Sequence, residues 1–258
     1  MGKALLIGIN KYQLPGNDLQ GCINDVQDLR SILINFYGYA DGDIKVITDG
    51  QATKRGMLDG LQWLVTTGDP NLILHFSGHG TQTIDSIADE SDRLDEALCP
   101  SDVLDQNGLV TDDQIAGYIN QAPLTTKFTF IADCCHSGTV NRVFAIGNPV
   151  YRKARYMSVP NNAVPNKPTR RYVKNLGGVR MSLLLSGCRD DQTSADAIFG
   201  NRPNGALTYF LLSILRANPK ISWRQAHAKV IGLLSRNRFD QVPQLSGPST
   251  MISSPVFS

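Results

Sequence analysis

Hydrophobic and polar positions along the chain form two alternating kinds of pattern. Short runs dominated by apolar or β-branched residues are typical of strands in a sheet that is buried on both faces. These predicted strands are 4–9, 43–48, 72–76, 127–132 and 181–185. Stretches with apolar residues every three or four positions predict helices. These predicted helices are 22–36, 57–65 after a cap at Thr53, 112–120, 205–215 and 223–234.

The alternation of strands and helices predicts an α/β fold with a mostly parallel central sheet and helices on both faces. The 258 residues are enough for one large domain, which we place at 1–258. Residues 81–106 form a polar stretch before the helix at 112–120, and an edge strand is expected within 244–257. Residues 148–178 are rich in proline and basic residues and show no apolar period, so we expect a linker outside the core.

Charge and cysteine content narrow the function classes. The net charge is only +2, and eight of the 25 basic residues lie in the segment 151–180, which contains no acidic residue. No aromatic-basic motif accompanies them, so we expect no nucleic-acid partner. No apolar run is long enough to span a membrane, and the N-terminus shows no signal-peptide cleavage pattern. Five cysteines without a paired spacing predict free thiols and a cytoplasmic location.

Two predicted strands end in residues that carry chemistry. One runs into Ser-Gly-His-Gly, which contains His79, and another into Asp-Cys-Cys-His-Ser-Gly, which contains Cys135. Reactive groups collect at the carboxyl ends of strands in open α/β sheets. A thiol needs a base to become a nucleophilic thiolate, and an imidazole can supply it. We therefore expect a His79 and Cys135 dyad, with the backbone N–H groups of Gly80 and Cys135 binding the oxyanion.

Strand alternation distinguishes the two adjacent cysteines. Asp133 and Cys135 share one face, whereas Cys134 and His136 share the other. A carboxylate beside the nucleophile hinders thiolate formation, so Asp133 is better suited to holding a substrate cation. This favours Arg or Lys before the scissile bond, with Arg favoured by bidentate geometry. The remaining cysteines and the histidines at 75, 136 and 227 are interpreted as structural.

Four motifs in order resemble the metacaspases and their prokaryotic relatives, the orthocaspases. They are Gly-Cys-Ile-Asn-Asp at 21–25, Ser-Gly-His-Gly at 77–80, Asp-Cys-Cys-His-Ser-Gly at 133–138 and Ser-Gly-Cys-Arg-Asp-Asp-Gln-Thr-Ser-Ala at 186–195. The resemblance implies a caspase-hemoglobinase fold, with a large catalytic segment at 1–147, the linker at 148–178 and a small segment at 179–258. It also implies that Asp25 and Asp133 form an acidic pocket lined by Ser77.

The resemblance leaves calcium dependence open. Asp95, Asp112 and Asp113 fall where some calcium ligands are expected in the family, but Asn141 and Arg142 stand where a further acidic ligand is expected. An arginine removes a ligand and adds repulsion. We therefore assign no metal site and expect no required cofactor, with calcium as the open alternative.

Together these features predict a cysteine endopeptidase that acts as a monomer on proteins or peptides with Arg or Lys before the scissile bond. The basic linker offers targets for autoprocessing, which are Arg152, Lys153, Arg155, Lys167, Arg170, Arg171 and Lys174. The main alternative is a catalytically silent caspase-like interaction module. A metal site made of Cys134, Cys135 and His136 is disfavoured, because three consecutive residues cannot easily converge on one ion.

Overall fold

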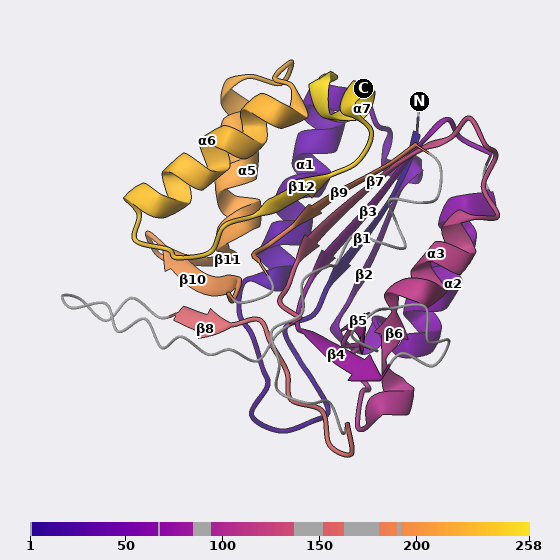
Figure 1. Ribbon diagram of the computed structural model, residues 1–258, viewed down its shortest axis with the longest axis vertical. Coiled ribbons are helices and arrows are strands. Elements are labelled where there is room, and N and C mark those ends of the chain that lie inside the picture. Colours follow the sequence, from indigo (N-terminus) through magenta and orange to yellow (C-terminus); the bar gives the residue numbers. More distant parts are fainter. Residues whose placement is uncertain (1, 67, 85–93, 137–151, 163–180, 190–191) are drawn as a thin grey trace.

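The computed structural model describes residues 2–66, 68–84, 94–136, 152–162, 181–189 and 192–258. A six-stranded sheet with the order β12-β9-β7-β3-β1-β2 forms its centre (Figure 1). Five strands are parallel and β12 is antiparallel at the edge. Their bounds are β1 Gly2–Gly8, β2 Ile44–Thr48, β3 Asn71–Ser77, β7 Lys127–Asp133, β9 Met181–Ser186 and β12 Gln244–Ser246.

Helices cover both faces of this sheet, as Figure 1 shows. Their bounds are α1 Cys22–Tyr37, α2 Lys54–Thr66, α3 Asp112–Ile119, α5 Ala206–Ala217, α6 Trp223–Arg236 and α7 Ser249–Ser253. Helices α2 and α3 pack on one core cluster, which includes Leu5 and Phe130. Helices α1, α5 and α6 pack on a second cluster on the opposite face, which includes Leu6 and Ile131. Neighbouring strand residues face opposite clusters, as the period of a buried strand requires.

The predicted α/β class and the mostly parallel sheet are confirmed. Each of the first five predicted strands and the five predicted helices is present with ends shifted by a few residues, and the edge strand expected within 244–257 is β12. The cap at Thr53 is also present, since its Oγ1 accepts a hydrogen bond from Gly56 N at 3.0 Å. No helix in the described part of the chain is long and apolar enough to cross a membrane.

Two small sheets were missed at the sequence level. One joins β4 Gly80–Ile84, β5 Leu94–Leu98 and β6 Val110–Thr111 within and after the stretch expected to be polar. The other joins β8 Arg152–Ala154, β10 Ala195–Phe199 and β11 Arg202–Gly205. Short 3₁₀ turns at Asp41–Asp43, Asp49–Gln51 and Gln106–Gly108 complete the elements of the described chain.

The expectation that 148–178 lies wholly outside the core was wrong for residues 152–162. Arg155 and Met157 are fully buried, and Val159 is nearly so. Met157 and Val159 belong to the same core cluster as α2 and α3. The buried residues of this segment are isolated among basic and polar residues, so the sequence shows no helical or strand period there. Individual contacts hold the segment in place instead of one continuous apolar face. The rest of that predicted linker lies outside the described residues.

Candidate functional site

The carboxyl ends of β3 and β7 lie side by side at one edge of the central sheet. Ser77 and Asp133 are paired in the last position of their parallel ladder. His79 follows two residues after Ser77, and Cys135 follows two residues after Asp133. A Cβ atom at Gly80 would lie 2.4 Å from the Cys135 carbonyl oxygen, so glycine permits the close approach of the two turns. The fold therefore brings the two predicted reactive segments together.

A fully buried arginine, Arg155, fills a pocket beside these strand ends. Its Nη1 donates to Ser77 Oγ at 2.8 Å and to the Asp133 carbonyl oxygen at 3.0 Å. Its Nη2 donates to Asp25 Oδ2 at 2.9 Å and to Asp196 Oδ1 at 3.0 Å. The Asp133 carboxylate also lies 3.3 Å from Nη1. The three predicted pocket residues thus surround one cation, together with a fourth residue that the sequence did not indicate.

Other groups fix the orientation of the two predicted carboxylates. Asp25 Oδ1 accepts hydrogen bonds from Asn204 Nδ2 at 2.9 Å and from Gly205 N at 3.0 Å, and Oδ2 accepts from Ser77 Oγ at 2.7 Å. Asp133 Oδ2 accepts from Thr208 N at 2.9 Å and Thr208 Oγ1 at 2.8 Å, at the start of α5. Carboxylates held in this way form a rigid recess that matches the planar fork of a guanidinium.

The pocket carries more acidic groups than one arginine can neutralise. Burial raises the pKa of Asp25 to about 7, and the Asp133 carboxylate acts in the same direction, while the Arg155 guanidinium opposes the shift. The three carboxylates make the pKa of Arg155 well above its ordinary value, although burial alone would lower it. A cation is therefore the group that this recess stabilises best.

The main chain of Arg155 is also bound at the strand ends. Its carbonyl oxygen accepts a hydrogen bond from Gly80 N at 3.0 Å and another from Cys135 N at 3.1 Å. These are the two backbone donors that the sequence predicted for an oxyanion. Arg155 N donates to the Ser194 carbonyl oxygen at 3.0 Å. The carbonyl of the residue that fills the acidic pocket is thus held between the segments that carry His79 and Cys135.

The segment around Arg155 runs across the site as strand β8 followed by a bend at Arg155 itself. On its N-terminal side, β8 pairs antiparallel with β10, in the sheet shown at the lower left of Figure 1. On its C-terminal side, Met157 N donates to the Gly80 carbonyl oxygen at 3.1 Å. The Arg155–Tyr156 peptide bond therefore lies between a bound strand and a bound core segment.

The Cys135 side chain is fully buried beside Ser194. Its Sγ accepts a hydrogen bond from Ser194 N and lies 3.4 Å from the Ser194 carbonyl oxygen. Among the described residues, the hydrogen bonds of this thiol are with Ser194 and Cys188 and not with His79. The arrangement puts the sulfur next to the Arg155 segment, with the imidazole as a separate group of the same site.

The His79 ring is held in a single tautomer. Its Nε2 lies 2.7 Å from the carbonyl oxygen of Asn17, which can only accept, so Nε2 carries the proton. Burial lowers the pKa of His79 to about 4, and the hydrogen bond to Asn17 opposes the shift. His79 Nδ1 has no hydrogen-bond partner among the described residues. The neutral ring therefore keeps a lone pair on Nδ1, as a general base requires.

The other histidines and three of the other cysteines have surroundings that fit the predicted structural role, whereas Cys188 is hydrogen-bonded to the Cys135 thiol. Burial is the leading cause that raises the pKa of the thiols of Cys22, Cys99 and Cys134. His75 Nε2 lies 3.3 Å from Thr208 Oγ1, His136 Nδ1 lies 3.2 Å from the Thr81 carbonyl oxygen, and His227 Nε2 lies 2.8 Å from the Pro243 carbonyl oxygen.

Asp196 is the main site residue that sequence reasoning missed. It is fully buried in β10, and its two oxygens accept hydrogen bonds from Gln20 N and Gly21 N, each at 2.9 Å. The signal was an aspartate inside the pattern Ala-Asp-Ala-Ile-Phe at 195–199, directly after the fourth motif. An aspartate within an apolar strand is rarely buried unless a cation or hydrogen-bond donors accompany it, so the position of Asp196 in the sequence could have indicated a role.

The candidate calcium ligands do not form a complete cluster in the described chain. Asp95 and Asp113 line one hollow together with Thr83 and Thr111, whereas Asp112 does not line it. No group of three or more His, Cys, Asp or Glu residues suited to a metal occurs among the residues whose positions are described. Asn141 and Arg142 lie outside those residues, so the expectation that no metal is required stays a prediction.

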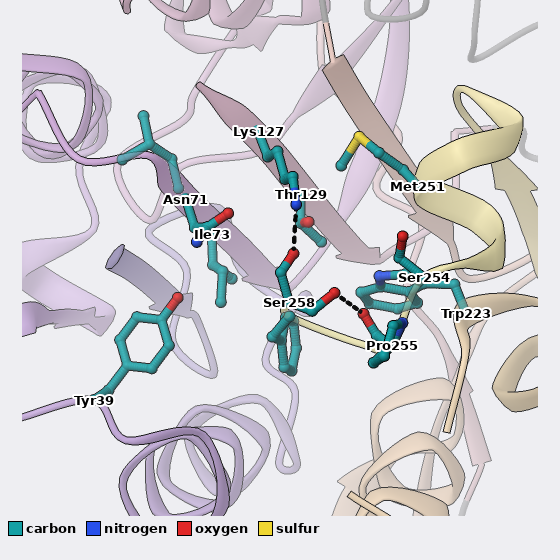
Figure 2. A pocket seen from close by; sticks show the side chains of 12 residues that line it. Tyr39, Asn71, Ile73, Lys127, Thr129, Trp223, Met251, Ser254, Pro255 and Ser258 are labelled. Atoms are coloured by element: carbon teal, nitrogen blue, oxygen red, sulfur yellow. Dashed lines mark hydrogen bonds between the residues drawn. The ribbon is translucent and has the colours of Figure 1, made fainter. Parts of the chain in front are cut away.

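A second hollow lies at the opposite end of the central sheet (Figure 2). It is lined by Asn71 and Lys127, which begin β3 and β7, and by Ser258. Lys127 Nζ donates to the Ser258 carbonyl oxygen at 3.2 Å, and Ser258 Oγ donates to the Pro255 carbonyl oxygen at 2.8 Å. This hollow holds C-terminal residues and is remote from the strand ends that carry the reactive groups.

Comparisons with known proteins agree with the geometry. The sequence profile of the metacaspase, peptidase C14 domain family matches residues 2–143. Metacaspase-1 of Schizosaccharomyces pombe is 34% identical over 95% of this chain and 66% of its own length, so the chain spans about two thirds of that relative. Metacaspase-1 of Pyricularia oryzae is 34% identical over 95% of the chain and 71% of its own length.

Two solved structures share the fold. Protein GSU0716 from Geobacter sulfurreducens has a TM-score of 0.71 at 25% identity, covering 100% of this chain and 98% of that one. Caspase-1 from Spodoptera frugiperda has a TM-score of 0.58 at 11% identity, covering 95% of this chain and 86% of that one, and it supports the caspase-like fold alone.

Proposed function

Because the chain belongs to the metacaspases, in peptidase family C14, we propose that it is a cysteine endopeptidase that cleaves peptide bonds after Arg or Lys. Cys135 is the nucleophile and His79 is the base in this proposal. Asp25, Ser77, Asp133 and Asp196 hold the side chain of the residue before the scissile bond.

One observation carries the proposal: the chain's own Arg155 occupies the site as a substrate residue would. Its guanidinium contacts the acidic pocket, while its carbonyl oxygen accepts hydrogen bonds from Gly80 N and Cys135 N. Two N–H donors aimed at one carbonyl oxygen are the arrangement that stabilises a tetrahedral oxyanion. Arginine is favoured over lysine because separate nitrogens of one planar group reach the different acceptors.

The chemistry follows from these positions. Cys135 Sγ loses its proton to His79 Nδ1 and attacks the carbonyl carbon, while Gly80 N and Cys135 N stabilise the oxyanion. The C–N bond then breaks, and the imidazolium of His79 returns the proton to the leaving amine. Water, deprotonated by His79, hydrolyses the thioester and regenerates the free thiol.

The thiol has to turn before it can attack, because its hydrogen bonds in this structure are with Ser194 and Cys188. Rotation about the Cα–Cβ bond of Cys135 moves the sulfur between staggered positions without a backbone change. The Asn17 carbonyl keeps the proton on Nε2 of His79 throughout, so that Nδ1 stays available.

The same contacts favour one bond for the predicted autoprocessing. Of the seven basic candidates, Arg155 combines a side chain in the acidic pocket with a carbonyl at the two N–H donors. Arg152 and Lys153 direct their side chains to other acceptors, and the remaining four candidates lie outside the described residues. We therefore place self-cleavage between Arg155 and Tyr156.

N-terminal sequencing and intact-mass measurement of purified protein test this proposal. Wild type is expected to yield a new N-terminus at Tyr156, whereas Cys135→Ala and Arg155→Gln stay intact. Arg170→Gln is the matched control and is expected to be cut normally. Cutting at another basic residue with the Arg155 bond intact, or cutting that persists in Cys135→Ala, would refute self-cleavage at this site.

Hydrolysis of short fluorogenic peptides tests the endopeptidase separately. Peptides ending in Arg are expected to be cleaved faster than those ending in Lys, and those ending in Asp hardly at all. We further propose that the protein works as a cytoplasmic monomer and needs no metal, so that a chelator leaves the rate unchanged. Failure to cleave any basic peptide would leave the catalytically silent module as the better account.

A further inference from the structure

Arg152 and Lys153, the two basic residues upstream of the occupied pocket, also have dedicated contacts. The β8–β10 register places Ala154 opposite Ala195, Lys153 opposite Asp196 and Arg152 opposite Ala197. This strand is therefore held by backbone pairing along the three residues before Arg155. Its side chains alternate in direction, so neighbouring residues meet different parts of the protein.

Arg152 binds against the turn that follows α6. Its guanidinium carbon lies 4.0 Å from the centre of the Phe239 ring. Its Nη1 donates to the Arg238 carbonyl oxygen at 2.7 Å, and its Nη2 donates to the Asn237 carbonyl oxygen at 3.1 Å. A guanidinium over an aromatic face with two carbonyl acceptors at its edge is a recognisable arginine site.

The aromatic platform is rigid. Phe239 is buried and its ring centre lies 5.9 Å from that of Phe199 and 6.1 Å from that of Phe210. Because two neighbouring rings already hold Phe239 in place, the binding of a cation does not cost the entropy of ordering this side chain. Burial lowers the pKa of Arg152, and the negative charge of the neighbouring Asp240 opposes this shift.

Lys153 binds to the loop that precedes α1. Its Nζ donates to the Gly16 carbonyl oxygen at 2.8 Å and to the Asp18 carbonyl oxygen at 2.9 Å. The carbonyl between these two, that of Asn17, is the one that holds Nε2 of His79. The loop that receives the lysine is thus the loop that fixes the imidazole.

We infer that the substrate site extends to two further cation subsites, one for an arginine at the fourth residue before the scissile bond and one for a lysine at the third. Phe239 and the Asn237 and Arg238 carbonyls form the first, and the Gly16 and Asp18 carbonyls form the second. The chemical class of substrate is a segment with the pattern Arg-Lys-small-Arg. This inference rests on the proposed cleavage after a basic residue.

Peptide hydrolysis by the full chain tests the two subsites. The protein used carries Arg152→Ala, Lys153→Ala and Arg155→Ala, because it lacks the three side chains that occupy the two subsites and the pocket. The probes are acetyl-Arg-Lys-Ala-Arg-aminomethylcoumarin and the peptides with Ala at the fourth position, the third position or both. Each replacement is expected to lower kcat/KM about tenfold. Equal kcat/KM for the four peptides would overturn the inference while leaving the proposed function intact.

A Phe239→Leu variant separates recognition from folding. Leu keeps an apolar side chain in the cluster but removes the ring face. The preference for Arg over Ala at the fourth position is expected to fall to about threefold or less, while the preference for Lys over Ala at the third position stays about tenfold. An unchanged preference contradicts the assignment of Phe239.

Absence of hydrolysis with every peptide would refute the proposed function and not the subsites. In that outcome, fluorescence polarisation measures the binding of labelled Arg-Lys-Ala-Arg to the same triple variant with Cys135→Ala added. Tighter binding of this peptide than of Ala-Ala-Ala-Arg supports the subsites, and equal binding overturns them.

Discussion

Replacing Asp196 with Asn removes one negative charge from the pocket while keeping the shape of the side chain. Asp196 Oδ1 accepts from Arg155 Nη2 and Gly21 N, and Oδ2 accepts from Gln20 N. Both oxygens face donors, so the amide of an Asn has to place its own N–H₂ against one of them. The change therefore weakens the binding of a substrate arginine and the hold on the loop before α1.

The expected loss of binding free energy follows from the burial of the ion pair between Asp196 and the arginine in the pocket. Removing one partner from a buried, hydrogen-bonded ion pair typically costs about 2–5 kcal/mol. Asp25 and Asp133 remain to neutralise the guanidinium, so the lower end applies. A loss of about 2 kcal/mol corresponds to a ~30-fold lower kcat/KM for a substrate with arginine before the scissile bond.

The assay compares arginine with citrulline, its uncharged analogue, in otherwise identical peptides. Wild type is expected to prefer arginine strongly, and Asp196→Asn is expected to reduce that preference by about the same ~30-fold. Asp28→Asn is the control, because Asp28 forms partly exposed ion pairs with Arg202 and Arg216 outside the pocket. Such pairs contribute only about 0–1 kcal/mol. An arginine preference that is unchanged in Asp196→Asn would refute a role for this carboxylate in the pocket.

Three other predictions follow from the same geometry. Burial raises the pKa of Asp25 to about 7, so its carboxylate is protonated below that pH. The value of kcat/KM for arginine peptides should therefore fall as the pH drops through about 7. This decrease at low pH should be missing from the pH profile of Asp25→Asn. Gly205→Ala would place a Cβ atom 2.3 Å from Asp133 Oδ2 and should abolish cleavage after Arg, whereas Gly232→Ala, in open space, should be active. Protein cut after Arg155 should elute as one species in size-exclusion chromatography and separate only when denatured, because Met157 stays buried in the core; early separation under native conditions would contradict this.

The central sheet could be predicted from the sequence because its strands are buried on both faces. Continuous apolar runs, such as that of β3, are unambiguous when helical patterns separate them. The small strands β8 and β10 were not predicted, because their sequences are not continuous apolar runs. They contain charged residues, Lys153 and Asp196 among them, whose burial or binding depends on partners far away in sequence.

The candidate site was predictable where the chemistry depends on residue type and strand-end position. His79, Cys135, Gly80 and Asp133 were predicted in this way, and Asp25 and Ser77 through the family resemblance. Their catalytic and binding roles stay predictions. Arg155 was only one of seven basic candidates, because the sequence does not show which of them reaches the pocket. Arg155 and Asp196 are in contact but lie 41 positions apart in the sequence. No local sequence pattern indicates a contact between residues so far apart.

Covalent capture shows directly whether Cys135 is the nucleophile of a site that accepts basic side chains. A peptidyl chloromethyl ketone with the sequence acetyl-Arg-Lys-Ala-Arg is incubated with the Arg155→Ala protein, and the labelled residue is located by peptide mapping and mass spectrometry. We expect one label, on Cys135, with the buried thiols of Cys22, Cys99 and Cys134 unmodified and no label in the protein that also carries Cys135→Ala. Labelling of another cysteine while Cys135 stays free would contradict the account.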